Sequence, residues 1–201
     1  LHGRSATAFG VGYSVCNGLG MNIWTLRHPP IDRQGLCIGQ THCPCTMPPE
    51  DSMLQASGNA PFVPVQIMSS DLLRCSRLAE DLADFWRCTV KLSPQLREMN
   101  FGDWDGLSYD EIDETDHVRW RAWCSNWLTE APPGGESIDQ FSTRIVNFLT
   151  AERPCEHTIL VTHAGVIRVL QVKTGESWDV AMSTKYPFLS WNCHAVKMTP
   201  E

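Results

Sequence analysis

Two arginines and two histidines occupy places where the chain is expected to leave a strand. Arg27 and His28 end an apolar run near the start of the chain, and His163 ends another. Arg74 follows the end of a third run by about one helical turn. A guanidinium group offers forked donors that match phosphate or carboxylate oxygens, and a neutral histidine is a competent nucleophile. These residue types predict a phosphate site in which one histidine attacks and the second, protonated, stabilises charge on the transferred group.

Taken alone, each of these side chains would more often have a structural role than a catalytic one. The prediction therefore depends on the fold placing all four at one site. In parallel α/β sheets, ligands bind beyond the carboxyl ends of the strands. If the strands before His28 and His163 are neighbours, both rings reach the same edge of the sheet. The helix expected to begin at Ala164 would add free backbone N–H groups, which favour an anion. Such a pocket would hold phosphate without a metal or any other cofactor.

Strand and helix patterns alternate along the chain, and this alternation predicts the fold class. The fold is expected to be α/β, a three-layer sandwich with a mostly parallel central sheet and helices on both faces. The helix that carries Arg74 would be capped by Ser70 or Asp71. The strands are expected at residues 22–27, 63–69, 89–92, 158–162 and 195–198, and the helices at 49–56, 70–85, 136–149 and 164–173, with an interrupted helical stretch at 104–128.

Composition narrows the partners and the compartment. The formal net charge of -7 argues against a nucleic-acid partner, which would need a basic surface. No apolar run reaches the roughly 18 residues that a membrane-spanning helix needs, so no membrane partner is expected. Nine cysteines, an odd number at irregular spacing, favour a reducing cytoplasm over a disulfide framework. The tightest group, Cys37, His42, Cys43 and Cys45, lacks the paired spacing of zinc sites, so no metal is predicted there.

A length of 201 residues fits one domain. Residues 1–20 are Gly-rich and too polar for a signal peptide, and Met21 opens the first strand-like run. We therefore expect residues 1–20 to be a leader or an upstream artefact outside the fold, and residues 21–201 to be the functional domain. A chain beginning at Met21 should fold and keep its activity. The sequence leaves open whether the chain forms a homo-oligomer.

At these residues the sequence resembles the histidine phosphatase superfamily, also called the phosphoglycerate-mutase-like family. The resemblance runs from Met21 to about Leu170, and the matched segments follow the family order. They are LRH at 26–28, SSDLLRC at 69–75, LREMNFGDWDG at 96–106, PPGGES at 132–137 and VTHAGVIR at 161–168.

The resemblance implies a phosphomonoesterase that works through a phosphohistidine. In that family pattern His28 is the nucleophile, and Glu98 protonates the leaving alkoxide and then activates water. The phosphate oxygens would be held by Arg27, Arg74 and His163. Glu98 would need to be protonated before the first step, which partial burial beside a phosphate dianion favours.

One departure from the family pattern points to a particular branch. Pro29 stands where most of the superfamily has glycine. Yet RHPP at 27–30, followed by CIGQT at 37–41, resembles the α-ribazole-phosphate phosphatase branch of cobalamin biosynthesis. That likeness implies a small phosphorylated metabolite, α-ribazole 5′-phosphate, as substrate. Its further contacts would be Gln40, Thr41 and Ala164, and one or two rings of the aromatic-rich stretch (Trp104, Tyr109, Trp120, Trp123 and Trp127) could stack on the substrate ring.

Two other functions compete with this interpretation. The first is a phosphoglycerate mutase or a broad-specificity sugar-phosphate phosphatase of the same fold, although the resemblance implies that mutases of this family are longer chains. The second is a non-catalytic phosphate-binding domain. The presence of the full set of five residues argues against the second alternative, because a binding domain has no need for a nucleophile or a proton donor.

Overall fold

A five-stranded sheet runs through the centre of the molecule, of which the computed structural model describes residues 20–33 and 35–197. The strands are β1 (Gly20–Arg27), β2 (Gln66–Ser70), β3 (Thr89–Ser93), β4 (Thr158–Thr162) and β5 (Trp191–Lys197). Their order across the sheet is β3-β2-β4-β1-β5. All neighbours are parallel except β5, which runs antiparallel to β1. The predicted mostly parallel sheet is therefore confirmed.

The pairing of β1 with β4 brings the two histidines to one edge. Arg27 lies opposite Thr162 in the register, and the His28 backbone N–H donates to the Thr162 carbonyl at 3.0 Å. The chain then leaves β4 at His163, the N-cap of the helix that follows. The expectation that the two strands are neighbours is thus correct.

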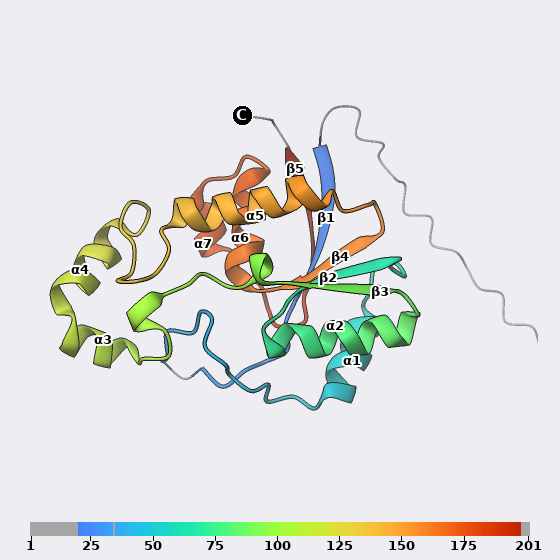
Figure 1. Cartoon of the computed structure of the whole chain (residues 1–201), viewed down its shortest axis with the longest axis horizontal. Helices are drawn as coiled ribbons and strands as arrows, with labels where there is room; N and C mark the ends of the chain where they lie inside the picture. The colour runs from blue at the N-terminus through green and yellow to red at the C-terminus, as the bar shows by residue number, and fades with distance from the viewer. Residues whose placement is uncertain (1–19, 34, 198–201) are drawn as a thin grey trace, which may run out of the picture.

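Helices cover both faces of the sheet, as predicted (Figure 1). One face carries α1 (Pro49–Gly58) and α2 (Leu73–Trp86). The other carries α5 (Ile138–Glu152) and α6 (Ala164–Lys173), with α7 (Trp178–Ser183) packed on α6. The sequence patterns did not predict α7, which is short and begins at a Ser177 cap. Two short 3₁₀ turns, η1 (Pro94–Leu96) and η2 (Gly102–Trp104), flank the segment that carries Glu98.

The two cores follow from strand alternation. In β4, Ile159 and Val161 point into the core beneath α1 and α2, whereas Leu160 points into the core beneath α5 and α6. All five residues of β4 are buried, which is the pattern expected of a central parallel strand.

Several predicted boundaries differ from the structure. The strand expected at 63–69 begins only at Gln66, because Pro64 lacks the N–H that a ladder needs and the flanking valines are exposed. The helix expected from residue 70 begins at Leu73, with Leu72 as its N-cap and no side-chain cap. Ser70 Oγ instead lies 2.9 Å from His163 Nε2, and the Asp71 carboxylate forms a forked ion pair with Arg97 at 2.6 Å. The last strand is longer than expected and starts at Trp191.

A helical insertion stands apart from these layers, at one end of the molecule (Figure 1). It consists of α3 (Tyr109–Thr115), which opens with a Ser108–Glu111 capping box, and α4 (His117–Asn126). The predicted interruption between the two helices is real. Trp104 is buried beneath the insertion in a third small core with Cys37 and Ile112.

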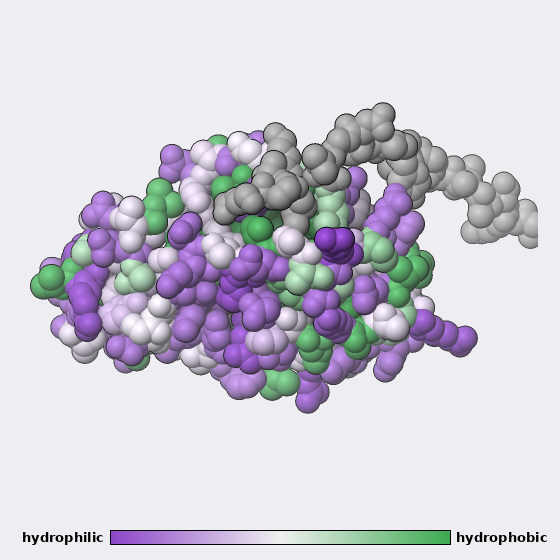
Figure 2. Space-filling view, turned by 45° about the horizontal axis from the view of Figure 1, so that its top comes forward, coloured by the Kyte–Doolittle hydropathy of each residue, from purple (hydrophilic) through white to green (hydrophobic). Residues whose placement is uncertain are grey.

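The predicted leader, residues 1–20, lies outside the described residues except for Gly20, which pairs with Lys197. None of the helices in the described part of the chain has the length and apolar character to cross a membrane. The face drawn in Figure 2 is covered mostly by hydrophilic residues, with hydrophobic ones in small separate groups. Most large apolar side chains are accounted for by the cores.

Truncating Trp104 should destabilise the insertion. The side chain is 2% exposed, and its indole N–H donates to Asp116 at 2.9 Å. Trp104→Ala should lower the free energy of unfolding by about 3–5 kcal/mol, because it leaves a cavity and removes the hydrogen bond from the indole to Asp116. Urea denaturation measures the change. Trp104→Phe, which retains most of the volume, should cost less, and an alanine variant as stable as the wild type would contradict this packing.

Candidate active site

His28 is held as a neutral ring with one free nitrogen. Its Nδ1 lies 2.7 Å from the Pro29 carbonyl oxygen, which can only accept, so Nδ1 carries the proton and Nε2 keeps its lone pair. Burial, together with the charge of Arg74, lowers the pKa of His28 well below 6.5. A buried imidazole with a free Nε2 lone pair has the state that a nucleophile requires.

His163 lies beside it, with the two ring centres 5.2 Å apart. Arg74 Nε, which can only donate, lies 3.3 Å from His163 Nδ1, so the ring proton is on Nε2 and points to Ser70 Oγ at 2.9 Å. Burial, and next the charge of His28, lowers the pKa of His163 well below 6.5. The ring is therefore neutral in the free protein, because it is completely buried beside another titratable ring. The protonated state that the sequence predicts concerns the transition state, with the phosphoryl group in place.

Arg27 is fixed by a segment that the sequence did not indicate. Its Nη1 donates to the Tyr186 carbonyl, and its guanidinium carbon lies 4.0 Å from the centre of the Phe188 ring. Burial, and then the nearby Arg33, lowers the pKa of Arg27 to about 10, so it stays charged at neutral pH. Its Nε is buried without a hydrogen-bond partner. One donor of Arg27 thus stays open to an acceptor.

Arg74 is oriented by a loop rather than by a carboxylate. Its Nη1 donates to the Thr41 carbonyl at 3.0 Å, and its Nη2 donates to the Gly39 carbonyl. The loop is held in turn by Asp105, whose carboxylate accepts from the backbone N–H of Gly39 at 3.0 Å, of Gln40 at 2.5 Å and of Thr41 at 3.3 Å. Asp105 therefore positions Arg74 through three residues of backbone.

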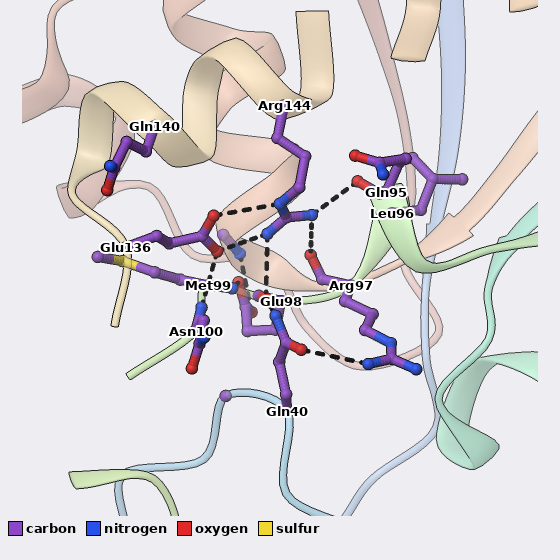
Figure 3. Close-up of polar contacts among 12 residues, drawn as sticks. Gln40, Gln95, Leu96, Arg97, Glu98, Met99, Asn100, Glu136, Gln140 and Arg144 are labelled. Carbon is purple, nitrogen blue, oxygen red and sulfur yellow. Dashed lines mark hydrogen bonds and ion pairs between the residues drawn. The ribbon is translucent and has the colours of Figure 1, made fainter. Parts of the chain in front are cut away.

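The predicted substrate contacts in this loop point elsewhere. The Gln40 side chain donates to the Glu98 carbonyl at 3.3 Å and accepts from Arg97 at 3.4 Å (Figure 3). The Thr41 side chain faces Gly106. Neither residue lines the cavity described below. The structure gives both of them contacts that hold the site together, whereas the third predicted contact, Ala164, does line the cavity.

Glu98 is anchored at the start of α6. Its carboxylate accepts from the Gly165 N–H at 3.1 Å and from the Met99 N–H at 3.0 Å. A Cβ at Gly165 would lie 2.0 Å from Glu98 Oε1, so this approach requires glycine. The helix N-terminus that was predicted to favour a bound anion thus gives one of its N–H groups to this carboxylate.

A cavity of about 520 Å³ joins these residues to an aromatic wall. At its polar end lie Arg27, His28, Arg74, Glu98, Ala164 and Gly165. Its apolar end includes Tyr109, Trp120 and Trp123, whose rings stack at 5.9 and 5.5 Å with interplanar angles of 15° and 16°. Trp127 also lines it, while Trp104 lies edge-on behind the stack. Most of the aromatic-rich stretch therefore faces the cavity.

Four further residues of the site were missed by sequence reasoning. Arg168 lies four residues after Ala164 and shares its helix face, a spacing that could have revealed it. Arg33, Tyr186 and Phe188 lie in irregular segments with no pattern to mark them. Among the described residues, no group of three or more His, Cys, Asp or Glu converges in a way that could hold a metal ion.

Comparison with known proteins identifies the family. Residues 52–193 match the histidine phosphatase superfamily (branch 1), and the chain therefore belongs to that superfamily. The matched range begins after β1, so the place of His28 in the site rests on the geometry above.

Similar proteins carry phosphatase names. The chain is 28% identical over 161 residues to the adenosylcobalamin/alpha-ribazole phosphatase of Salmonella typhimurium, covering 75% of this chain and 77% of that protein. It is 32% identical over 139 residues to the glucosyl-3-phosphoglycerate phosphatase of Mycobacterium tuberculosis, covering 64% and 58%. The alpha-ribazole phosphatase structure from Shigella flexneri shares the fold, with a TM-score of 0.76, 23% identity and coverage of 86% and 89%. The predicted family and enzyme class, a phosphoric monoester hydrolase, are confirmed.

The buried histidines should make stability depend on pH. Burial lowers the pKa of His28 and His163, and lowers that of His194 to about 4, whereas an unfolded histidine titrates near about 6.5. As the pH falls from about 7 to about 5, the unfolded chain takes up protons first, and the free energy of unfolding falls by up to about 1.4 kcal/mol per pH unit for each histidine. Urea titrations across this range measure the slope. His163→Gln should make it shallower, and an unchanged slope would contradict the neutral state of this ring.

Proposed function

We propose that this chain hydrolyses α-ribazole 5′-phosphate through a phosphohistidine intermediate. The observation that carries the proposal is one cavity with His28 and two arginines at one end and stacked aromatic rings at the other. The cationic end suits a phosphate, and the aromatic end suits the benzimidazole ring of the riboside. The name of the Salmonella relative supports the same substrate.

The first step transfers the phosphoryl group to His28. Its Nε2 attacks phosphorus, so that a P–N bond forms as the P–O bond to the ribose breaks. Glu98 starts this step protonated and gives its proton to the leaving oxygen, so the riboside departs as an alcohol. Arg27 Nε, the buried donor without a partner, and the remaining N–H groups of Arg74 bind the equatorial oxygens.

The second step releases inorganic phosphate. The Glu98 carboxylate takes a proton from water, the water oxygen attacks phosphorus, and the P–N bond breaks. His28 returns to its neutral state, in which its Nδ1–H donates to the Pro29 carbonyl, and Glu98 is again protonated. His163 lies behind Arg74 and accepts the Arg74 Nε–H at its Nδ1. When the substrate dianion draws that N–H toward itself, the ring can take up a proton there and add its charge to the site.

Removing the nucleophile tests the chemistry. His28→Ala should lower turnover by about 10⁴-fold or more, because the proposed covalent intermediate forms on His28 Nε2. Rapid acid-free quenching should trap acid-labile phosphate on the wild type and none on the variant. The assay includes excess chelator, because the proposed phosphate ligands are arginines and histidines. The surface variant His117→Ala is the control and should retain full activity, and near-normal turnover of His28→Ala would refute the mechanism.

A sugar phosphate that carries a carboxylate is the second candidate substrate. Arg33 and Arg168 also line the cavity and would meet a second anionic group, and the Mycobacterium tuberculosis relative is named for a phosphoglycerate ester. The aromatic stack favours the riboside, because a compact sugar acid has no planar ring to place on it.

We also infer a cytoplasmic setting, in keeping with the buried free thiols of Cys37 and Cys75.

Substrate selectivity should depend on the aromatic wall. The wild type should hydrolyse α-ribazole 5′-phosphate with a higher kcat/KM than 3-phosphoglycerate or fructose phosphates. Trp123→Leu should lower kcat/KM for the riboside about 5- to 150-fold, which corresponds to the ~1–3 kcal/mol of a stacked base. The kcat/KM for 3-phosphoglycerate should stay nearly unchanged. Trp86→Leu is the matched control, because Trp86 lies at the far end of α2 from Arg74 and does not line the cavity. If compact sugar phosphates are cleaved as well as the riboside, the substrate assignment fails and the phosphatase chemistry stands.

A further inference from the structure

Arg144 reaches from α5 to the backbone of the segment that carries Glu98 (Figure 3). Its Nη1 donates to the carbonyl of Gln95 at 2.7 Å and to that of Arg97 at 3.1 Å, and its Nη2 donates to the carbonyl of Glu98 at 3.3 Å. One side chain thus binds three carbonyls within four consecutive residues. Glu98 itself is among them.

Glu136 completes the arrangement from the loop before α5. Its Oε2 lies 3.1 Å from Arg144 Nε and its Oε1 lies 2.5 Å from Arg144 Nη2, so the two side chains form a forked ion pair. The same Oε1 accepts from the Asn100 N–H at 2.8 Å, and the Glu136 N–H donates to the Asn100 carbonyl at 3.0 Å. The pair therefore binds the chain on both sides of Glu98.

The segment needs such support because no regular structure provides it. Residues 97–101 lie between η1 and η2, outside any helix or strand. The carboxylate of Glu98 has two backbone donors, at Met99 and Gly165, and the first of these belongs to the same segment. The direction of the carboxyl group thus depends on where the Glu98 backbone is held.

We infer that Arg144 and Glu136 are positioning residues that aim the Glu98 carboxyl at the leaving-group oxygen. The inference rests on the proposed function, in which Glu98 is the proton donor. A proton donor works only within hydrogen-bond reach of its acceptor, and a shift of about 1 Å removes much of its effect. Arg144 contributes to the reaction through this backbone, without lining the cavity.

The test uses esters whose leaving groups differ in basicity. An alkyl phosphate needs protonation of its leaving oxygen, whereas an activated aryl phosphate such as 4-nitrophenyl phosphate does not. Arg144→Gln should lower kcat for the alkyl ester by about 10²-fold and change the aryl ester by less than about threefold, a split that general acid catalysis predicts. Glu136→Gln, which keeps the shape of the side chain, should show the same trend with a smaller loss.

A double variant separates positioning from a general structural role. If Arg144 acts through Glu98, Arg144→Gln should cause no further leaving-group-dependent loss once Glu98→Gln is present. Arg121→Gln is the matched control. Arg121, on the exposed α4, forms a similar forked ion pair with Asp113 of α3, and this variant should hydrolyse both esters at the wild-type rate. Urea denaturation checks that each variant is folded. Should Arg144→Gln fail to fold, Glu136→Gln carries the same double-variant comparison.

The outcomes separate this inference from the function on which it rests. Equal losses on both esters in Arg144→Gln and Glu136→Gln, or additive losses in the double variant, would overturn the positioning role alone if Glu98→Gln still discriminates between the esters. If Glu98→Gln affects both esters equally, the acid role of Glu98 is refuted, and the positioning role is refuted with it.

Discussion

The parallel pairing of β1 with β4 is the interaction on which the site depends. Its register places Arg27 opposite Thr162, so that the residues following the two strands, His28 and His163, leave the sheet at the same edge. Side chains alternate between the faces of a strand, so a slip of one residue would exchange the side chains that face the two cores and leave both cores mispacked. Packing on both faces therefore enforces the register. The separation of the two rings follows from the stability of the whole sheet rather than from any local contact.

The site combines buried cations with buried neutral rings. Burying a guanidinium is costly unless its donors are satisfied, and here backbone carbonyls supply most of the partners for Arg27 and Arg74. The same burial, with the nearby positive charge, lowers the pKa of His28 and His163. The pocket of an acidic protein thus holds fixed positive charge and an uncharged nucleophile together. A phosphate dianion would be bound by the fixed positive charge of the arginines, while His28 stays neutral and able to attack.

Sequence patterns predicted those parts of the molecule that depend on local periodicity. The buried run of β4 and the helix that follows His163 were found almost to the residue, because apolar alternation and helical spacing are read directly from the chain. The contacts of Arg27 with Tyr186 and Phe188 join residues far apart in the sequence, and no local pattern marks them. The protonation of His163 depends on burial, which only the tertiary structure supplies. The loop at Gln40 was correctly placed near the site, but its side chain turned out to bind backbone.

Phosphate chemistry and substrate selectivity are located on different elements, and one short turn joins them. The proposed phosphate ligands lie at the sheet edge, while the aromatic stack belongs to the α3–α4 insertion. Between them, Trp104 ends η2 and supports the stack from behind, and Asp105 follows at once and holds the loop that orients Arg74. A change at Trp104 would therefore disturb the phosphate end as well as the wall. Trp123 lines the cavity and meets Trp104 in an edge-on ring contact, so a change at Trp123 acts on the wall more directly than on Asp105.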